Sequence, residues 1–374
     1  MHTPDVADAR RSASEPVSAP SPGRGPLTSP FVRGRDHLRS YLRSAGAVAL
    51  TLALVGALVA ALGTSPVAAY SAILRGALGT PFNIGQTVMI AALLILTGLA
   101  AAIPFSARLW NIGGEGQMYF GAIVAAGIGI NVPAGWPRWI AVPVVLTCSA
   151  LGGALWGWVP GWLKARFDAS EMIVSLMMNF VAITLATYVI TDLWPQGFAP
   201  QTEYVAANAT LPLLLPGTLV NLGVVIALVA TVIAWVVMTR TPLGFSIQAV
   251  GANARASRLA GIKIGRVTVA CFALAGAFAG LAGAIVVQGI SRALVADFSG
   301  SFGFIGIAVA LLARLKPAWI LPSALFFAIM RVGSNSLQAS TGLSPTIGEV
   351  LVATFVVLLM VMGVIRLRYA EAVS

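Results

Sequence analysis

The sequence predicts an all-α polytopic membrane protein with about ten transmembrane helices, some of them discontinuous. Of its 374 residues, 58% are hydrophobic and 9% are charged, and the mean hydropathy is +0.90. These values are far more apolar than those of a soluble domain. Apolar runs of about 20 residues, each long enough for a hydrocarbon core of roughly 30 Å, recur between residues 45 and 365. The predicted spans are 45–62, 84–104, 111–131, 139–160, 172–192, 218–238, 267–289, 294–313 (broken), 317–335 and 346–365.

Basic residues predict the orientation of these spans. An even number of spans places both termini on one side, and all but four of the 23 Lys and Arg residues then share that side. By the positive-inside rule, both termini are predicted to be cytoplasmic. The net charge of +11 therefore indicates orientation and contact with anionic membrane lipid, and no nucleic-acid partner is predicted.

Cysteine and histidine usage argues against a metal or redox site. Cys148 and Cys271 lie in separate predicted spans, so neither a disulfide nor a metal-ligand spacing is visible. His2 and His37 both lie in the amino-terminal tail. We therefore predict no metal, no cofactor and no enzymatic activity, because the spans contain no histidine and no closely spaced acidic pair.

Residues 1–40 are predicted to form a disordered, basic cytoplasmic tail. They mix Pro, Ser, Ala, Gly and Arg without apolar periodicity, and such a composition buries too little surface to offset its ordering entropy. The first apolar run starts near residue 45, too late for a signal peptide. Residues 41–370 are expected to form the transmembrane domain, with a short interfacial helix within 63–83.

The third span carries the most informative segment, LWNIGGEGQMYFGA at 109–122. A carboxylate, two amides and four glycines interrupt membrane-spanning sequence there, and lipid does not tolerate such groups unshielded. Asn111, Glu115 and Gln117 are therefore predicted to face a bundle interior or a translocation path, which indicates a transporter. Two roles stay open: these groups line a substrate path, or they cap a discontinuous helix and hold the bundle together.

Four further residues are candidates for the substrate path. Asn179 is an amide inside a span, which either bonds across helices or contacts a ligand hydroxyl. Phe120, Phe302 and Phe304 are aromatic rings that could stack on a base or a sugar face. The last two begin a half-helix within 294–313, whose amino terminus we expect Asp297 or Ser301 to cap.

Two connections between spans have distinctive compositions. Residues 193–217 are proline-rich and contain no Lys or Arg, and they are expected to be an external loop that either meets a partner or acts as a spacer. Residues 239–266 alternate small and basic residues, which predicts a short helix with a small-residue face. That helix either docks on another protein or lies on the membrane with its basic side chains toward headgroups. The punctuating glycines favour docking.

Several motifs resemble the permease subunits of ATP-binding-cassette importers, in the branch that serves nucleosides, simple sugars and branched-chain amino acids. The motifs are NIGGEGQMYFGA at 111–122, TPLGF at 241–245, AVGAN at 249–253 and ARASRLAGIKIGR at 254–266. KARFDASEMIVSLMMNF at 164–180 and SFGFIGIAVALLARLKP at 301–317, where Ser301 replaces a glycine, point to the nucleoside and simple-sugar type. The resemblance assigns ATPase coupling to residues 239–266, in particular to Gly244, Phe245, Gly251, Asn253, Arg255, Ala260 and Gly261.

The resemblance also implies partners. The chain has no GxxxxGK[ST] pattern to hold a nucleotide's phosphates, so a separate cytoplasmic ATPase is expected. A second permease chain, identical or related, would complete the pore, and an extracytoplasmic binding protein or lipoprotein would deliver the solute. The predicted function is half of an importer of nucleosides or simple sugars in a bacterial inner (plasma) membrane. The alternative is a secondary transporter driven by an ion gradient, in which Glu115 and Glu349 would be the titrating groups.

Overall fold

The computed structural model describes residues 63–341 without a gap, and outside that range residues 49–50, 53–57, 59–61, 350 and 353–354. The chain divides into two units, Met1–Leu50 and Thr51–Ser374, and every element discussed below belongs to the second unit. The predicted tail 1–40 lies outside the described residues. The predicted last span 346–365 lies almost entirely outside them.

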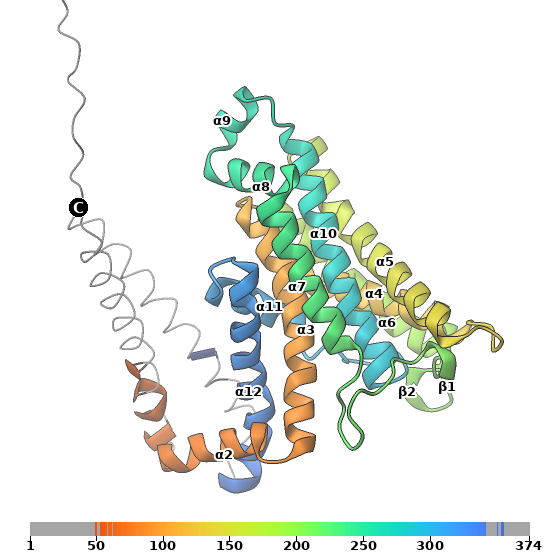
Figure 1. The fold of residues 1–374 in the computed structure, drawn as a ribbon, viewed down its shortest axis with the longest axis vertical. Coiled ribbons are helices and arrows are strands. Elements are labelled where there is room, and N and C mark those ends of the chain that lie inside the picture. Colours follow the sequence, from red (N-terminus) through yellow and green to blue (C-terminus); the bar gives the residue numbers. More distant parts are fainter. Residues whose placement is uncertain are drawn as a thin grey trace, which may run out of the picture. The chain divides into compact units, whose positions relative to one another are not determined.

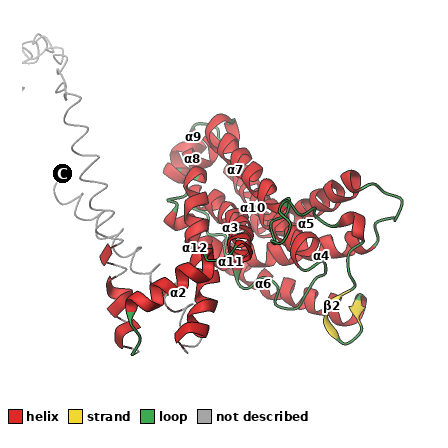
Figure 2. Ribbon diagram, turned by 60° about the horizontal axis from the view of Figure 1, so that its bottom comes forward, coloured by secondary structure: helices red, strands yellow, loops and turns green. Residues whose placement is uncertain are grey.

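Among the described residues, the regular secondary structure is helical apart from one small hairpin (Figures 1 and 2). The hairpin is antiparallel and consists of β1 (Pro195–Gln196) and β2 (Ala199–Thr202). The helices are α2 (Pro66–Leu78), α3 (Pro81–Ser106), α4 (Gly114–Ile130), α5 (Arg138–Phe167), α6 (Glu171–Tyr188), η2 (Val189–Leu193), η3 (Ala207–Ala209), α7 (Gly223–Arg240), α8 (Pro242–Ala252), α9 (Ala254–Leu259), α10 (Ile264–Ile285), η4 (Val286–Ile290), α11 (Phe302–Leu312) and α12 (Pro317–Thr341).

Local sequence sets where several helices begin. α2 and α3 both start with a proline, preceded by Ser65 and Thr80 respectively. The hydroxyl of Thr80 accepts from the backbone N–H of Asn83 at 3.1 Å. Proline suits the first helical position because it lacks the N–H that would be unpaired there, and the hydroxyl satisfies another such donor. The same pairing of Thr241 and Pro242 starts α8.

Six helices among the described residues are long and apolar enough to cross a membrane, or seven if the bent pair Ala53–Ala61 and α2 forms one span. They are α3, α5, α6 with η2, α7, α10 with η4, and α12, which correspond to six of the predicted spans. The predicted span 111–131 is the 17-residue α4, and 294–313 contains only the 11-residue α11. The prediction of a polytopic helical membrane protein is confirmed, whereas the count of about ten and the side of the termini stay predictions.

Glycines let α10 pack closely against α5 and α4. A Cβ at Gly280 would lie 3.1 Å from the Cα of Gly153 and would overlap the carbonyl oxygen of Ser149. A Cβ at Gly121 would similarly overlap the backbone of Gly280. The small-residue run at 275–284 therefore allows close backbone approach, as such runs do in membrane bundles.

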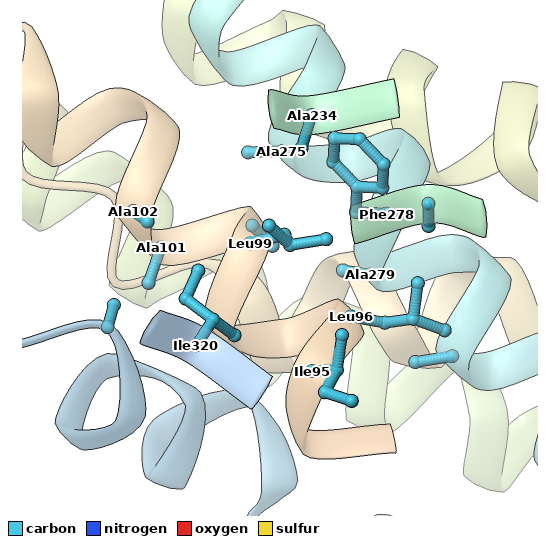
Figure 3. Close-up of a cluster of buried hydrophobic side chains, with 14 of the residues drawn as sticks. Ile95, Leu96, Leu99, Ala101, Ala102, Ala234, Ala275, Phe278, Ala279 and Ile320 are labelled. Atoms are coloured by element: carbon cyan, nitrogen blue, oxygen red, sulfur yellow. The ribbon is translucent and has the colours of Figure 1, made fainter. Parts of the chain in front are cut away.

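α3 is the central helix of the bundle. In its most apolar window 89% of the residues are buried, against 28% for α7. Figure 3 shows Leu96 and Leu99 of α3 among Phe278 of α10, Ala234 of α7 and Ile320 of α12. The outer helices thus leave large apolar faces for lipid or for another chain.

Two helices begin inside the bundle instead of at its ends. α4 follows the irregular segment 107–113, and α11 follows the irregular segment 291–301. A Cβ at Gly306 of α11 would lie 2.6 Å from the backbone of Thr97, which is well inside α3. Helices α8 and α9 lie at one end of the bundle, at the top of Figure 1, and α2 and the hairpin lie at the other. We call the end with α8 and α9 the basic end.

Between α7 and α10 the chain forms two helices, α8 and α9, so the prediction of a single short helix within 239–266 was wrong. Asn253 separates them, because its side chain accepts from the backbone N–H of Ala256 at 3.0 Å and so starts α9. Asparagine is a strong amino-terminal cap. The chain consequently turns at Asn253 between α8 and α9.

Candidate functional site

The amides predicted at the start of α4 pair with each other. Asn111 Nδ2 donates to Gln117 Oε1 and Gln117 Nε2 donates to Asn111 Oδ1, both at 3.3 Å. Asn111 Oδ1 also accepts from the backbone N–H of Gly113 at 3.0 Å. These bonds hold the irregular segment 107–113 against the first turns of α4.

Asn179 joins this segment to α6. Its Oδ1 accepts from the N–H of Gly116 at 2.8 Å, and its Nδ2 donates to the carbonyl of Ile112 at 3.0 Å. One turn earlier on the same helix face, Ser175 Oγ accepts from the N–H of Ile112 at 3.2 Å. A Cβ at Gly116 would lie 2.9 Å from the Cα of Asn179, so glycine is needed for this approach.

Glu115 joins α4 to α11. Its Oε2 accepts from the backbone N–H of Gly303 at 2.8 Å, and its Oε1 accepts from the hydroxyl of Ser299. A carboxylate at a helix amino terminus satisfies an unpaired donor and complements the helix dipole. The prediction that Asp297 or Ser301 caps this helix was wrong: Ser301 stands at the cap position but makes no side-chain capping bond, and Glu115 of α4 accepts the bond instead.

The four predicted polar side chains are buried with partners inside the chain. Glu115 is 3% exposed, and Asn111, Gln117 and Asn179 are each 1% exposed. A carboxylate at this depth is costly unless hydrogen bonds compensate it, and the bonds from Ser299 and Gly303 do so. We call residues 111–117, Ser175, Asn179, Ser299 and Gly303 the polar seam. It joins α4, α6 and α11, and a substrate-path role for its side chains stays a prediction.

The three predicted aromatic residues lie in different environments. Phe120 stacks on Trp156 of α5, with ring centroids 4.4 Å apart and planes 19° apart. Phe302 is buried and belongs to the main hydrophobic core. Phe304, in the first turn of α11, is 39% exposed. Of the three, Phe304 is the ring most accessible to a solute.

Within the predicted coupling residues, two glycines face the bundle. A Cβ at Gly244 would lie 2.6 Å from the Cα of Met238 in α7. A Cβ at Gly251 would overlap the carbonyl oxygen of Ser106, at the end of α3, and would lie 3.0 Å from its carbonyl carbon. Ile247 and Val250 of α8 are buried in the same core as α3. α8 is therefore anchored on α7 and α3.

The remaining predicted coupling residues are exposed at the basic end. Phe245 is 69% exposed, and Asn253, Arg255, Ala260 and Gly261 are also exposed. Gly261 has φ of 84°, a left-handed conformation that glycine adopts without strain. Leu259, which was not among the predicted coupling residues, is 85% exposed. Two large apolar side chains exposed on short helices are typical of a protein-contact surface.

At the opposite end, the predicted external loop is packed onto the chain. The N–H of Thr202 donates to Leu294 and that of Val205 donates to Arg292, both at 2.9 Å. Gln288 is fully buried in η4 and donates from Nε2 to the carbonyl of Ala209 at 2.7 Å. The sequence contained no local signal for these contacts. Ser175 was also missed, although its spacing of four from Asn179 places both on one helix face.

The comparisons with known proteins decide the family. Residues 83–365 match the model of the permease component of the branched-chain amino acid transport system. The chain belongs to this permease family. The resemblance predicted from the motifs is therefore confirmed, and so is the prediction that the chain is a transporter subunit and no enzyme.

Several relatives align with most of this permease. It is 34% identical to a glucose ABC transporter permease protein of Haloferax volcanii over 326 residues, covering 84% of this chain and 85% of that protein. It is 33% identical to a guanosine ABC transporter permease protein of Bacillus subtilis, covering 79% and 85%. A nucleoside ABC transporter permease protein of Lactococcus lactis is 32% identical, covering 83% and 88%. No solved structure gives a significant match.

Proposed function

We propose that this permease forms half of the pore of an importer for nucleosides or simple sugars in a bacterial inner membrane. A cytoplasmic ATPase, a second permease chain and an extracytoplasmic binding protein would complete the complex. The relatives named for guanosine, nucleosides and glucose support this solute class. Their solutes share a ring that carries several hydroxyl groups.

The observation that carries the proposal is the anchoring of α8. Phe245 and Leu259 are exposed and in this proposal contact the ATPase. The opposite side of α8 packs on the end of α3 at Ser106 without room for one methyl group. A displacement of α8 would therefore be transmitted to α3, because tightly packed elements do not deform continuously.

The polar seam offers a route from α3 to the interior of the bundle. α3 ends at Ser106, and the next seven residues lead to α4, where Glu115 binds the amino terminus of α11. A movement of the end of α3 would thus also displace α11, the half-helix that carries Phe304. In this proposal ATP-driven closure at the basic end reorients α4 and α11 and opens the passage toward the cytoplasm.

We further propose that Phe304 contacts the solute, whereas the seam positions it. An exposed aromatic ring can stack on a nucleobase or on the apolar face of a sugar. Replacing Phe304 with alanine is expected to raise the KM for solute about tenfold, in line with roughly 1 to 3 kcal/mol for an aromatic stacked on a base. Basal ATP hydrolysis should be unchanged. Phe302→Ala, in the buried neighbour, should lower thermal stability instead.

Uptake into vesicles tests the function. The full chain is reconstituted with its ATPase, partner permease and binding protein, and radiolabelled guanosine, adenosine, ribose and glucose are offered with and without ATP. The proposal requires uptake that depends on ATP and on the ATPase. Uptake that survives without ATP and collapses with an ionophore would establish the ion-driven alternative.

A further inference from the structure

A groove of about 590 Å³ lies between the end of α5 and the start of α10. Its walls are largely apolar and include Trp162 and Ala165 on one side and Val269 and Ala270 on the other. Three basic residues, Arg166, Lys263 and Arg266, also line it, and all three are exposed. The volume falls within the range of about 300 to 1,000 Å³ that is typical of small-ligand sites.

The floor of the groove is built by close helix packing. A Cβ at Gly161 would lie 3.1 Å from the Cα of Val269, and a Cβ at Gly265 would lie 3.4 Å from the Cβ of Ala165. α5 and α10 therefore meet closely behind the groove. Ala165 and Gly265 line the groove at this contact.

The three cations of the groove have no acidic partner in the part of the chain that the structure describes. Both ion pairs found there belong to Lys164, which contacts Asp168 at 2.8 Å and Glu171 at 3.3 Å. The hydrogen bond and the charge of Lys164 hold the pKa of Asp168 below its ordinary value, so that carboxylate stays ionised and bound to Lys164. Among the described residues, therefore, none of the three cations that line the apolar groove forms an ion pair.

Aromatic residues indicate that the groove lies at the membrane interface. Trp158, Trp162 and Phe167 form a ladder on α5, with Trp162 5.6 Å from Trp158 and 5.5 Å from Phe167 between ring centroids. Tryptophan gathers where hydrocarbon meets headgroups. An occupant of this groove would have a negative head beside the cations and an apolar tail beside Trp162 and Ala270.

From this combination we infer that the groove binds one anionic phospholipid. Its phosphate would lie among Arg166, Lys263 and Arg266, and one acyl chain would run along Trp162, Val269 and Ala270. Basic pockets between helices on the cytoplasmic side of a membrane are suited to such headgroups. The inference needs the chain to span a membrane with its basic end inward, and it is independent of the transported solute.

Native mass spectrometry of the delipidated full chain in detergent tests this. Phosphatidylglycerol and phosphatidylcholine are titrated separately, and the affinity for the first bound lipid is measured. Each Lys or Arg near an anionic headgroup contributes roughly a factor of five, so replacing all three cations with alanine should weaken phosphatidylglycerol binding on the order of 100-fold. Phosphatidylcholine binding should be weak in both proteins.

Two variants separate a built site from diffuse attraction. Ala165→Trp keeps every charge but fills the apolar wall at an exposed position, and it should also weaken phosphatidylglycerol binding. The matched control removes three charges at the same end outside the groove, Arg240→Ala, Arg255→Ala and Arg258→Ala, and should bind as the wild type does. Thermal unfolding of each variant establishes that it is folded.

Four results would overturn the inference. The first is equal affinity of the wild type for both lipids, and the second is unchanged phosphatidylglycerol binding in the variant that lacks the three groove cations. The third is an equal loss of phosphatidylglycerol binding in the control variant. The fourth is full competition by glycerol phosphate, which lacks acyl chains. A loss of ATPase co-purification in the groove variant with lipid binding unchanged would assign this surface to the ATPase.

Discussion

Gly251→Ala is expected to uncouple ATP hydrolysis from transport. The added methyl group would overlap the carbonyl oxygen of Ser106 and lie 3.0 Å from its carbonyl carbon. Both partners are backbone, so no side chain can swing aside, and α8 must move away from α3. Overpacking of this kind costs typically about 1 to 3 kcal/mol. If that cost reduces the coupling free energy between the ATPase contact at α8 and the solute passage, the coupling factor falls roughly 5- to 150-fold.

The assay is the number of solute molecules imported for each ATP hydrolysed, in vesicles containing the full complex. We expect this ratio to fall at least about fivefold, with ATP hydrolysis retained. Gly135→Ala is the matched control: nothing lies within 4 Å of its Cβ position, its φ is not left-handed, and it lies outside the predicted coupling segment. It should leave the ratio near that of the wild type. A normal ratio in Gly251→Ala would refute transmission through the contact between α8 and α3.

Three predictions concern the polar seam and α11, each checked by thermal unfolding in detergent and by uptake. Glu115→Ala leaves Gly303 N–H unpaired and should lower the free energy of unfolding by about 2 to 4 kcal/mol. Glu115→Gln keeps an acceptor and should lower it by about half as much. Equal losses of stability in the two variants would argue against the capping role. Asn179→Ala leaves two buried backbone groups without a hydrogen-bond partner and should lower the free energy of unfolding by about 2 to 5 kcal/mol. Unchanged stability would contradict the bonds to α4. Ser301 has φ of 65°, and Ser301→Gly should stabilise α11 by up to about 1 kcal/mol by relieving left-handed strain; a lower melting temperature would show that the serine side chain matters more than the strain.

Local and periodic signals in the sequence were enough for the class of fold and the position of most elements. Apolar length predicted the helices that could cross the membrane. The motif at 241–266 predicted a coupling segment, and that role stays a prediction. The start of α9 was also predictable from local sequence, since the side chain of Asn253 caps the helix that follows it. A prediction of one helix there failed because the spacing of small residues was read without that cap.

The polar seam shows where the sequence stopped being sufficient. The composition of residues 111–117 determined that their polar groups need shielding, since a lipid environment offers them no partners. It did not determine which partners they have. Asn179 and Gly116 are 63 residues apart, and Glu115 and Gly303 are 188 residues apart.

Which partners these polar groups bind depends on tertiary packing alone. Several polar groups along the chain could satisfy the same carboxylate, and local propensity does not distinguish among them. Their selection depends on which helix faces meet, and that depends on glycines that let particular backbones approach. The sequence by itself therefore determined a membrane permease with a polar segment that needs shielding, and it predicted a coupling loop. Only the folded chain decided that Glu115 caps α11 and that α8 rests on the end of α3.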